Sequence, residues 1–181
     1  VRHWSCNHTL SGIERKDMKD AIQDQIIEDF AVFDDWLDKY DYLIELSDSL
    51  PPMDPAHKTD EYLINGCQSR LWIDARMQDG KVYYSADSDA IITKGITALL
   101  MRVMNGRTPQ QILDTDLYFI DAIGLKENLS PTRSNGLLAM IKQMRMYALA
   151  FNAELQAGHD KPTTADAEGA ASAPQAPVAE K

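Results

Sequence analysis

Apolar and polar residues alternate from Leu71 to Ala86, on both sides of the dipeptide Asp79-Gly80. Alternation with a period of two is typical of a half-buried β-strand, and Asp-Gly favours the type I′ turn that joins hairpin strands. Such a turn pairs Gln78 with Lys81 and places the apolar residues of both strands on one face. The opposed pairs on that face are Met77 and Val82, Ala75 and Tyr84, and Ile73 and Ala86. Turn and alternation require the same register, so the sequence predicts a β-hairpin over about residues 70–86.

Helical spacing of apolar residues predicts two helices before this hairpin. We expect the second of them to begin at Asp34. Pro51-Pro52 ends it, because proline donates no backbone hydrogen bond and disfavours helix in the residue before it. The residues that define the two helices are Ile22, Ile26, Phe30 and Phe33, followed by Trp36, Leu37, Tyr40 and Ile44.

A third helix is expected directly after the hairpin. The polar cluster Asp87-Ser88-Asp89 supplies candidate caps for its first turn, and Gly106 follows its predicted end at Met104. Its predicted buried residues are Ile92, Ile96, Leu99 and Val103.

Three further helices are predicted toward the end of the chain. Thr108-Pro109-Gln110-Gln111 is a capping box with proline at the first helical position, which opens a short helix. Another short helix is expected over about residues 117–123, with Gly124 closing it. A final long helix is expected from Ser134 or Asn135. Its predicted apolar set is Leu137, Leu138, Ile141, Met144, Ala148 and Phe151.

These elements define one folded unit over residues 17–156. Residues 1–16 have no clear period and are interpreted as a loose leader. Residues 157–181 contain mainly Ala, Pro, Thr and Glu, and such a segment buries too little apolar surface to offset its ordering entropy, so we expect a disordered tail. Helices flanking a small antiparallel sheet predict an α+β fold.

The acidic charge of the chain limits the kinds of molecule that it is expected to bind. The net charge is −10, and residues 17–61 alone hold 14 acidic and 3 basic residues. A solvated acidic face is the favoured interpretation, and a docking surface for a basic partner is the alternative. Nucleic-acid binding is not expected because it needs clustered Lys and Arg. Membrane insertion is not expected either, because no apolar run approaches the roughly 18 residues needed to cross a bilayer.

The two cysteines, Cys6 and Cys67, are too few for a disulfide framework or a four-thiolate metal site, which indicates a reducing cytoplasm. Cys67 is the candidate reactive residue, because Gly66 before it allows a tight turn and leaves room for an incoming group. Its alternative role is that of a small buried apolar residue. Cysteine hydrolase chemistry has weak support, since His57 is the one histidine of the predicted folded unit. Zinc binding has weaker support still, because ligand spacing is absent.

Residues 58–72 of the chain, KTDEYLINGCQSRLW, closely resemble the active loop of the SufE family. Members of this family accept sulfur from cysteine desulfurases in iron–sulfur cluster assembly. Further blocks match in order and spacing, so that the resemblance spans about residues 22–146. These blocks are Leu50-Pro51-Pro52, Asp87-Ser88-Asp89-Ala90 with Lys94-Gly95, and residues 129–137, LSPTRSNGL.

The resemblance implies an α+β fold similar to that of the cluster-scaffold proteins, with Cys67 as the persulfide acceptor. It implies a pyridoxal-phosphate-dependent cysteine desulfurase as partner, SufS-like or a paralogue, and a cluster scaffold as the recipient of the sulfur. The pyridoxal phosphate belongs to the desulfurase, and no cofactor is expected here. The alternative function is non-covalent activation of the desulfurase with a structural Cys67.

The resemblance also implies supporting residues around the acceptor. Gly66, Gln68 and Ser69 belong to the loop motif itself. An unperturbed thiol, with a pKa of about 8.5, is mostly protonated near neutral pH, so the acceptor needs a proton acceptor or a positive field. Arg70 and Arg133 are the candidates for that field, and for each the favoured interpretation is a structural or interface arginine. For Asp89 we favour helix capping, and the alternative is that it steers the Cys67 loop.

Overall fold

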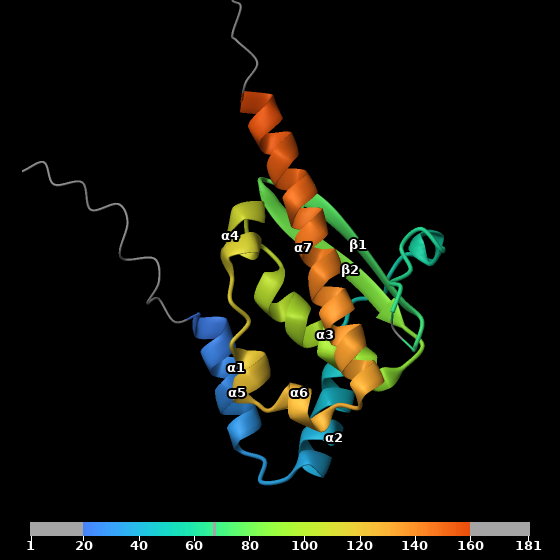
Figure 1. Ribbon diagram of the computed structural model, residues 1–181, viewed down its shortest axis with the longest axis vertical. Helices are drawn as coiled ribbons and strands as arrows, with labels where there is room; N and C mark the ends of the chain where they lie inside the picture. Colours follow the sequence, from blue (N-terminus) through green and yellow to red (C-terminus); the bar gives the residue numbers. More distant parts are fainter. Residues whose placement is uncertain (1–19, 67, 160–181) are drawn as a thin grey trace, which may run out of the picture.

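The computed structural model describes residues 20–66 and 68–159. Cys6, Cys67, the predicted leader and residues 160–181 of the predicted tail lie outside the described residues. The described part is built from helices around one antiparallel hairpin, which confirms the α+β fold (Figure 1). Its elements are α1 (Ala21–Ala31), α2 (Trp36–Ser47), the 3₁₀ helix η1 (Pro55–His57), β1 (Leu71–Gln78), β2 (Lys81–Ser88), α3 (Ile91–Met104), α4 (Pro109–Asp114), α5 (Phe119–Ala122), α6 (Leu125–Asn128) and α7 (Pro131–His159).

The hairpin has the predicted turn and register. Gln78 pairs with Lys81, and the three predicted apolar pairs face each other. Asp79 and Gly80 both adopt positive φ, 53° and 73°, as a type I′ turn requires. The strands run on to Ser88, two residues beyond the predicted end. Local turn chemistry and strand alternation therefore fix this part of the fold.

Helices α3 and α7 lie against the hairpin and enclose the core (Figure 1). Most of α3 is buried, where it packs between α2 and β2, whereas α7 packs on β1 and α4. Two tyrosines join hairpin and α7 by hydrogen bonds to backbone oxygens. Tyr84 donates to Met144 O at 2.7 Å, and Tyr147 donates to Ile73 O at 3.0 Å. Burial raises the pKa of Tyr84 well above its usual range, so this hydroxyl stays a donor.

Helix α7 begins earlier than predicted. Its first residue is Pro131, not Ser134 or Asn135, and Ser134 N already donates to Ser130 O at 2.9 Å. Proline suits a first helical position because its missing N–H would have no intrahelical partner there. Leu138, a member of the predicted apolar set, is exposed, whereas Met140, outside that set, lies in the core.

Helix α2 also differs from its prediction in detail. It is capped by Asp35 and not Asp34, with Asp35 Oδ1 accepting from Asp38 N at 3.0 Å. Leu37, part of the predicted apolar set, is 71% exposed, and Leu43 is fully buried in its place. The helical face turned to α3 is therefore displaced from the one that the sequence pattern indicated.

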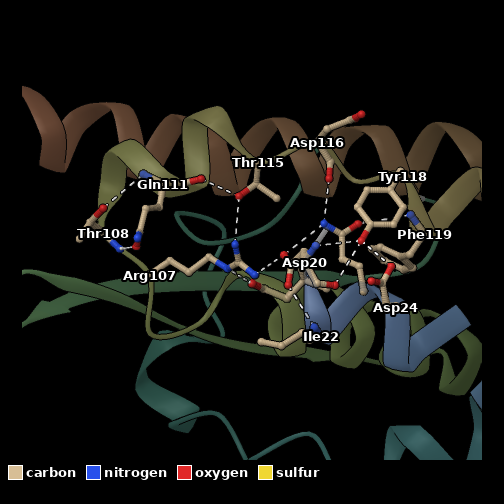
Figure 2. Close-up of polar contacts among 12 residues, drawn as sticks. Asp20, Ile22, Asp24, Arg107, Thr108, Gln111, Thr115, Asp116, Tyr118 and Phe119 are labelled. Carbon is tan, nitrogen blue, oxygen red and sulfur yellow. Dashed lines mark hydrogen bonds and ion pairs between the residues drawn. The ribbon is translucent and has the colours of Figure 1, made fainter. Parts of the chain in front are cut away.

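The capping box of α4 is confirmed. Beside it lies a polar network that joins α1 to the residues on either side of α4 (Figure 2). Arg107 forms an ion pair with Asp20, the N-cap of α1. Tyr118 donates to Asp24 at 2.8 Å, and buried Gln23 donates to Asp116 O, also at 2.8 Å. Sequence periodicity gave no sign of this network, since its partners lie more than 80 residues apart.

Candidate functional site

A short β-type pairing frames the loop that contains position 67. Leu63 forms an isolated bridge with Trp72 at the start of β1. Ile64 N donates to Leu71 O at 2.8 Å, and Ile73 N donates to Tyr62 O at 3.0 Å. Residues 65–70 are thus the connection between two paired segments. The sequence pattern places this loop before the first strand but gives no sign of the pairing that closes it.

The far end of the loop is held by the end of β2. Arg70 N donates to Asp89 Oδ1 at 3.0 Å, and Asp89 N donates to Arg70 O at 3.2 Å. Ser88 Oγ donates to the same Arg70 oxygen at 2.7 Å. The side chain of Asp89 therefore binds the backbone of the loop at Arg70.

The favoured capping role for Asp89 is wrong. The N-cap of α3 is Ala90, which has no side-chain capping bond. Ser88 Oγ accepts from Ala90 N at 3.2 Å, and Asp87 accepts from Ser88 N at 2.9 Å. All three polar residues of the predicted capping cluster instead bind backbone groups near the turn into the helix. The alternative role, in which Asp89 orients the loop, agrees with its bonds to Arg70.

Gly66 has a φ of +94°, in the left-handed region that L side chains rarely adopt. A Cβ built there would meet no described atom within 4 Å. Glycine is thus required by the backbone turn and not by crowding. This agrees with the expectation of a tight turn with free space before position 67.

A polar cleft of about 350 Å³ lies next to the loop. Gln68 and Ser69 contribute its loop side, and Arg133 contributes a cation from the first turn of α7. The remaining lining residues are Thr93 and Ile96 of α3, and Thr132, Gly136 and Met140 of α7. The structure therefore brings together three of the predicted supporting residues from two distant segments.

The other predicted residues lie differently. Arg70 is exposed and does not line the cleft, and Asp89 acts on the loop from its far end. Cys67 lies outside the described residues. Thr93 and Thr132 also line the cleft, although neither was among the predicted site residues. Thr132 falls within the motif of residues 129–137, which was the available signal, and Thr93 directly precedes the Lys94-Gly95 block.

Asp87 and Asp74, two acidic residues of the hairpin, have partners in the segment before the loop. Asp87 accepts from Lys58 at 2.5 Å and from Lys94 at 2.9 Å. Burial acts to raise the pKa of Asp87, but the hydrogen bonds from the two lysines lower it below its ordinary value. His57 pairs with Asp74 at 2.9 Å and packs on the ring of Tyr62. These contacts fasten the segment before the loop to both strands of the hairpin.

The fold is similar to that of a solved protein. The solution structure of a hypothetical protein from Thermus thermophilus matches with a TM-score of 0.61, over 73% of this chain and 96% of that one. The two sequences are 22% identical, so this likeness concerns the fold alone. No helix among the described residues is long and apolar enough to cross a membrane.

Sequence comparison identifies the family. The family described as "SufE: Fe-S metabolism associated domain" matches residues 24–148. An "Uncharacterized SufE-like protein" of Synechocystis sp. is 39% identical over 127 residues, which cover 70% of this chain and 80% of that protein. The chain belongs to the SufE family. It therefore has a role in iron–sulfur metabolism linked to a cysteine desulfurase.

Proposed function

We propose that this protein accepts persulfide sulfur from a cysteine desulfurase on Cys67 and passes it on to a cluster scaffold. The observation that supports this most strongly is the family match over residues 24–148, which includes the motif Asn65-Gly66-Cys67-Gln68-Ser69. The anchored ends of the loop agree with it, since a reactive group on a loop needs a rigid frame.

The transfer is a thiol–persulfide exchange that needs no oxidant or reductant. The Cys67 thiolate attacks the outer sulfur of the persulfide on the desulfurase. A new sulfur–sulfur bond forms on Cys67, the bond within the donor persulfide breaks, and the desulfurase cysteine leaves as a thiolate. The attacking thiol first loses its proton, and the positive charge of Arg133 or Arg70 favours the thiolate. Removing sulfur from the desulfurase frees it for another turnover, which accounts for stimulation.

The protein's proposed partner is a cysteine desulfurase, and its proposed location is the cytoplasm. The desulfurase is SufS-like or a paralogue and keeps the pyridoxal phosphate on which its chemistry depends. The cytoplasm is the proposed location, because a free acceptor thiol persists in a reducing compartment.

Intact-mass spectrometry tests the acceptor directly. The full chain is incubated with a desulfurase and L-cysteine, and one added sulfur atom is expected on the wild type and on Cys6→Ser, but not on Cys67→Ser. Cys6→Ser is the matched control because it removes the other thiol. Desulfurase turnover is measured in parallel. If Cys67→Ser still stimulates turnover and the wild type gains no sulfur, the protein is a non-covalent activator and the relay is excluded.

A further inference from the structure

We propose that the polar cleft lined by Gln68, Ser69, Thr93, Thr132 and Arg133 binds a small organic carboxylate. Its volume of about 350 Å³ falls within the range of small-molecule sites. The inference goes beyond the proposed function, because it requires no reaction at position 67.

Several polar side chains of the cleft have no hydrogen-bond partner in the described part of the chain. Thr93 is only 5% exposed, yet its hydroxyl finds no hydrogen-bond partner within residues 20–66 and 68–159. The side chains of Gln68, Ser69 and Thr132 likewise have no partner among the described residues. The Thr93 oxygen is therefore open to a partner from the cleft, water or ligand, since the polar groups of nearly buried residues normally bind one. The other three side chains are exposed or half-buried, so Thr93 is the nearly buried polar group that points to a ligand, and Gln68, Ser69 and Thr132 are further donors beside it.

The charge of the cleft selects an anion. Arg133 is the charged member of the described lining and forms no ion pair with any described residue. It lies in the first turn of α7, a helix of 29 residues with no acidic residue in that turn. Among described residues, the backbone N–H groups of Thr132 and Arg133 also lack acceptors. A guanidinium, free N–H groups and the positive end of a long helix dipole together favour an oxyanion.

Two apolar residues of the mainly polar lining favour an organic anion. Ile96 and Met140 line the cleft and are almost completely buried. They offer contact to a short hydrocarbon tail, which an inorganic oxyanion does not have. The described lining holds no carboxylate that could accept from an ammonium group. A simple carboxylate is thus favoured over an amino acid.

Titration of the full chain, followed through backbone amide NMR signals, tests the proposal. The probe is butyrate, and butyramide is its neutral counterpart of equal shape. Saturable shifts are expected at Gln68, Ser69, Thr132 and Arg133 with butyrate and not with butyramide. 2-Aminobutyrate and sulfate are expected to bind more weakly than butyrate. Equal binding of butyrate and butyramide excludes an anion site, and equal binding of sulfate excludes the organic ligand.

Two variants distinguish the site from general charge effects. Arg133→Gln is expected to weaken butyrate binding about tenfold or more, since it removes a charge-assisted hydrogen bond. Arg76→Gln is the matched control, because Arg76 is an exposed arginine on β1 outside the cleft. Unchanged affinity in Arg133→Gln overturns the proposal.

Thr93→Val gives a second and independent test. Valine has the shape of threonine without the hydroxyl, so butyrate binding is expected to weaken severalfold. Thermal stability of the free variant is expected to stay equal or to rise, because the hydroxyl has no described partner to lose. Clear destabilisation together with unchanged butyrate affinity shows a structural hydroxyl and overturns its assignment to the ligand.

Discussion

At the scale of single residues, Asp89 shows how a loop is held by one carboxylate. Its Oδ1 accepts from Arg70 N, and its own N–H donates to Arg70 O, so the two residues are joined by a reciprocal pair of hydrogen bonds. Arg70 is three residues beyond position 67. Any disturbance of Asp89 therefore reaches the loop through the backbone of Arg70.

Replacing Asp89 by Ala is expected to loosen this loop without unfolding the domain. The Arg70 amide loses its acceptor, which costs about 1 kcal/mol and corresponds to about fivefold faster amide hydrogen exchange. Asp89→Asn keeps an oxygen at the same place and is expected to retain most of the protection. Asp60→Ala is the control, since Asp60 is an exposed acid near the loop. Unchanged exchange at Arg70 in Asp89→Ala contradicts the proposed anchoring.

At the scale of elements, local signals predicted the hairpin and the capping box of α4. In both cases the interacting residues are close in sequence, and turn chemistry and alternation demand the same arrangement. The role of Asp89 failed as a prediction because its partner lies 19 residues away. The pairing of Leu63 with Trp72 gave no signal either, since the connection between them is not a two-residue turn. The buried face of α2 differs from the predicted one, because tertiary packing buries Leu43 and leaves Leu37 exposed.

The packing of α2 on α3 depends on Gly95, a residue that helix propensity alone disfavours. A Cβ at this position would overlap the backbone oxygen of Leu43 in α2. The close approach of the two helices accounts for a glycine in the middle of α3. The Lys94-Gly95 block of the family motif thus has a packing reason.

Gly95→Ala is expected to destabilise the protein by about 3 kcal/mol, since the obstacle is rigid backbone and the helices must separate. Gly80→Ala is the comparison: its positive φ carries strain of about 1 kcal/mol, but its surroundings are open. Urea denaturation of the two variants measures the difference. Equal losses of stability contradict the close contact between α2 and α3.

At the scale of the whole molecule, the cleft is assembled from segments that the chain separates widely. Gln68 comes from the loop, Thr93 from α3 and Arg133 from α7. Periodicity predicted the elements but not how they meet, because that depends on the packing of the complete core. The motif resemblance drew attention to Arg133 and the loop. Only the folded chain shows that Thr93, Ile96 and Met140 also line the cleft.

The ion pairs that join distant segments make stability depend on pH, and Asp87 is the clearest example. Its carboxylate binds Lys58, before the loop, and Lys94, in α3. Burial acts to raise its pKa, but the lysine hydrogen bonds hold the pKa below the ordinary 3.8. A carboxyl group whose pKa is lowered by folding stabilises the protein above its unfolded pKa. This contribution is lost as the pH falls through the folded pKa.

Asp87→Asn is therefore expected to lower the melting temperature by about 3 °C, or about 1 kcal/mol, at about pH 5 to 7. The difference from the wild type shrinks as the pH falls from 3.8 through the lowered pKa of folded Asp87, where the carboxylate becomes protonated and loses its attraction to both lysines. Asp60→Asn, which removes the same charge from an exposed site, controls for the change in net charge. Melting curves from pH 2 to pH 7 measure both differences. A difference between Asp87→Asn and the wild type that stays constant down to pH 2 shows that the carboxylate charge does not stabilise the fold.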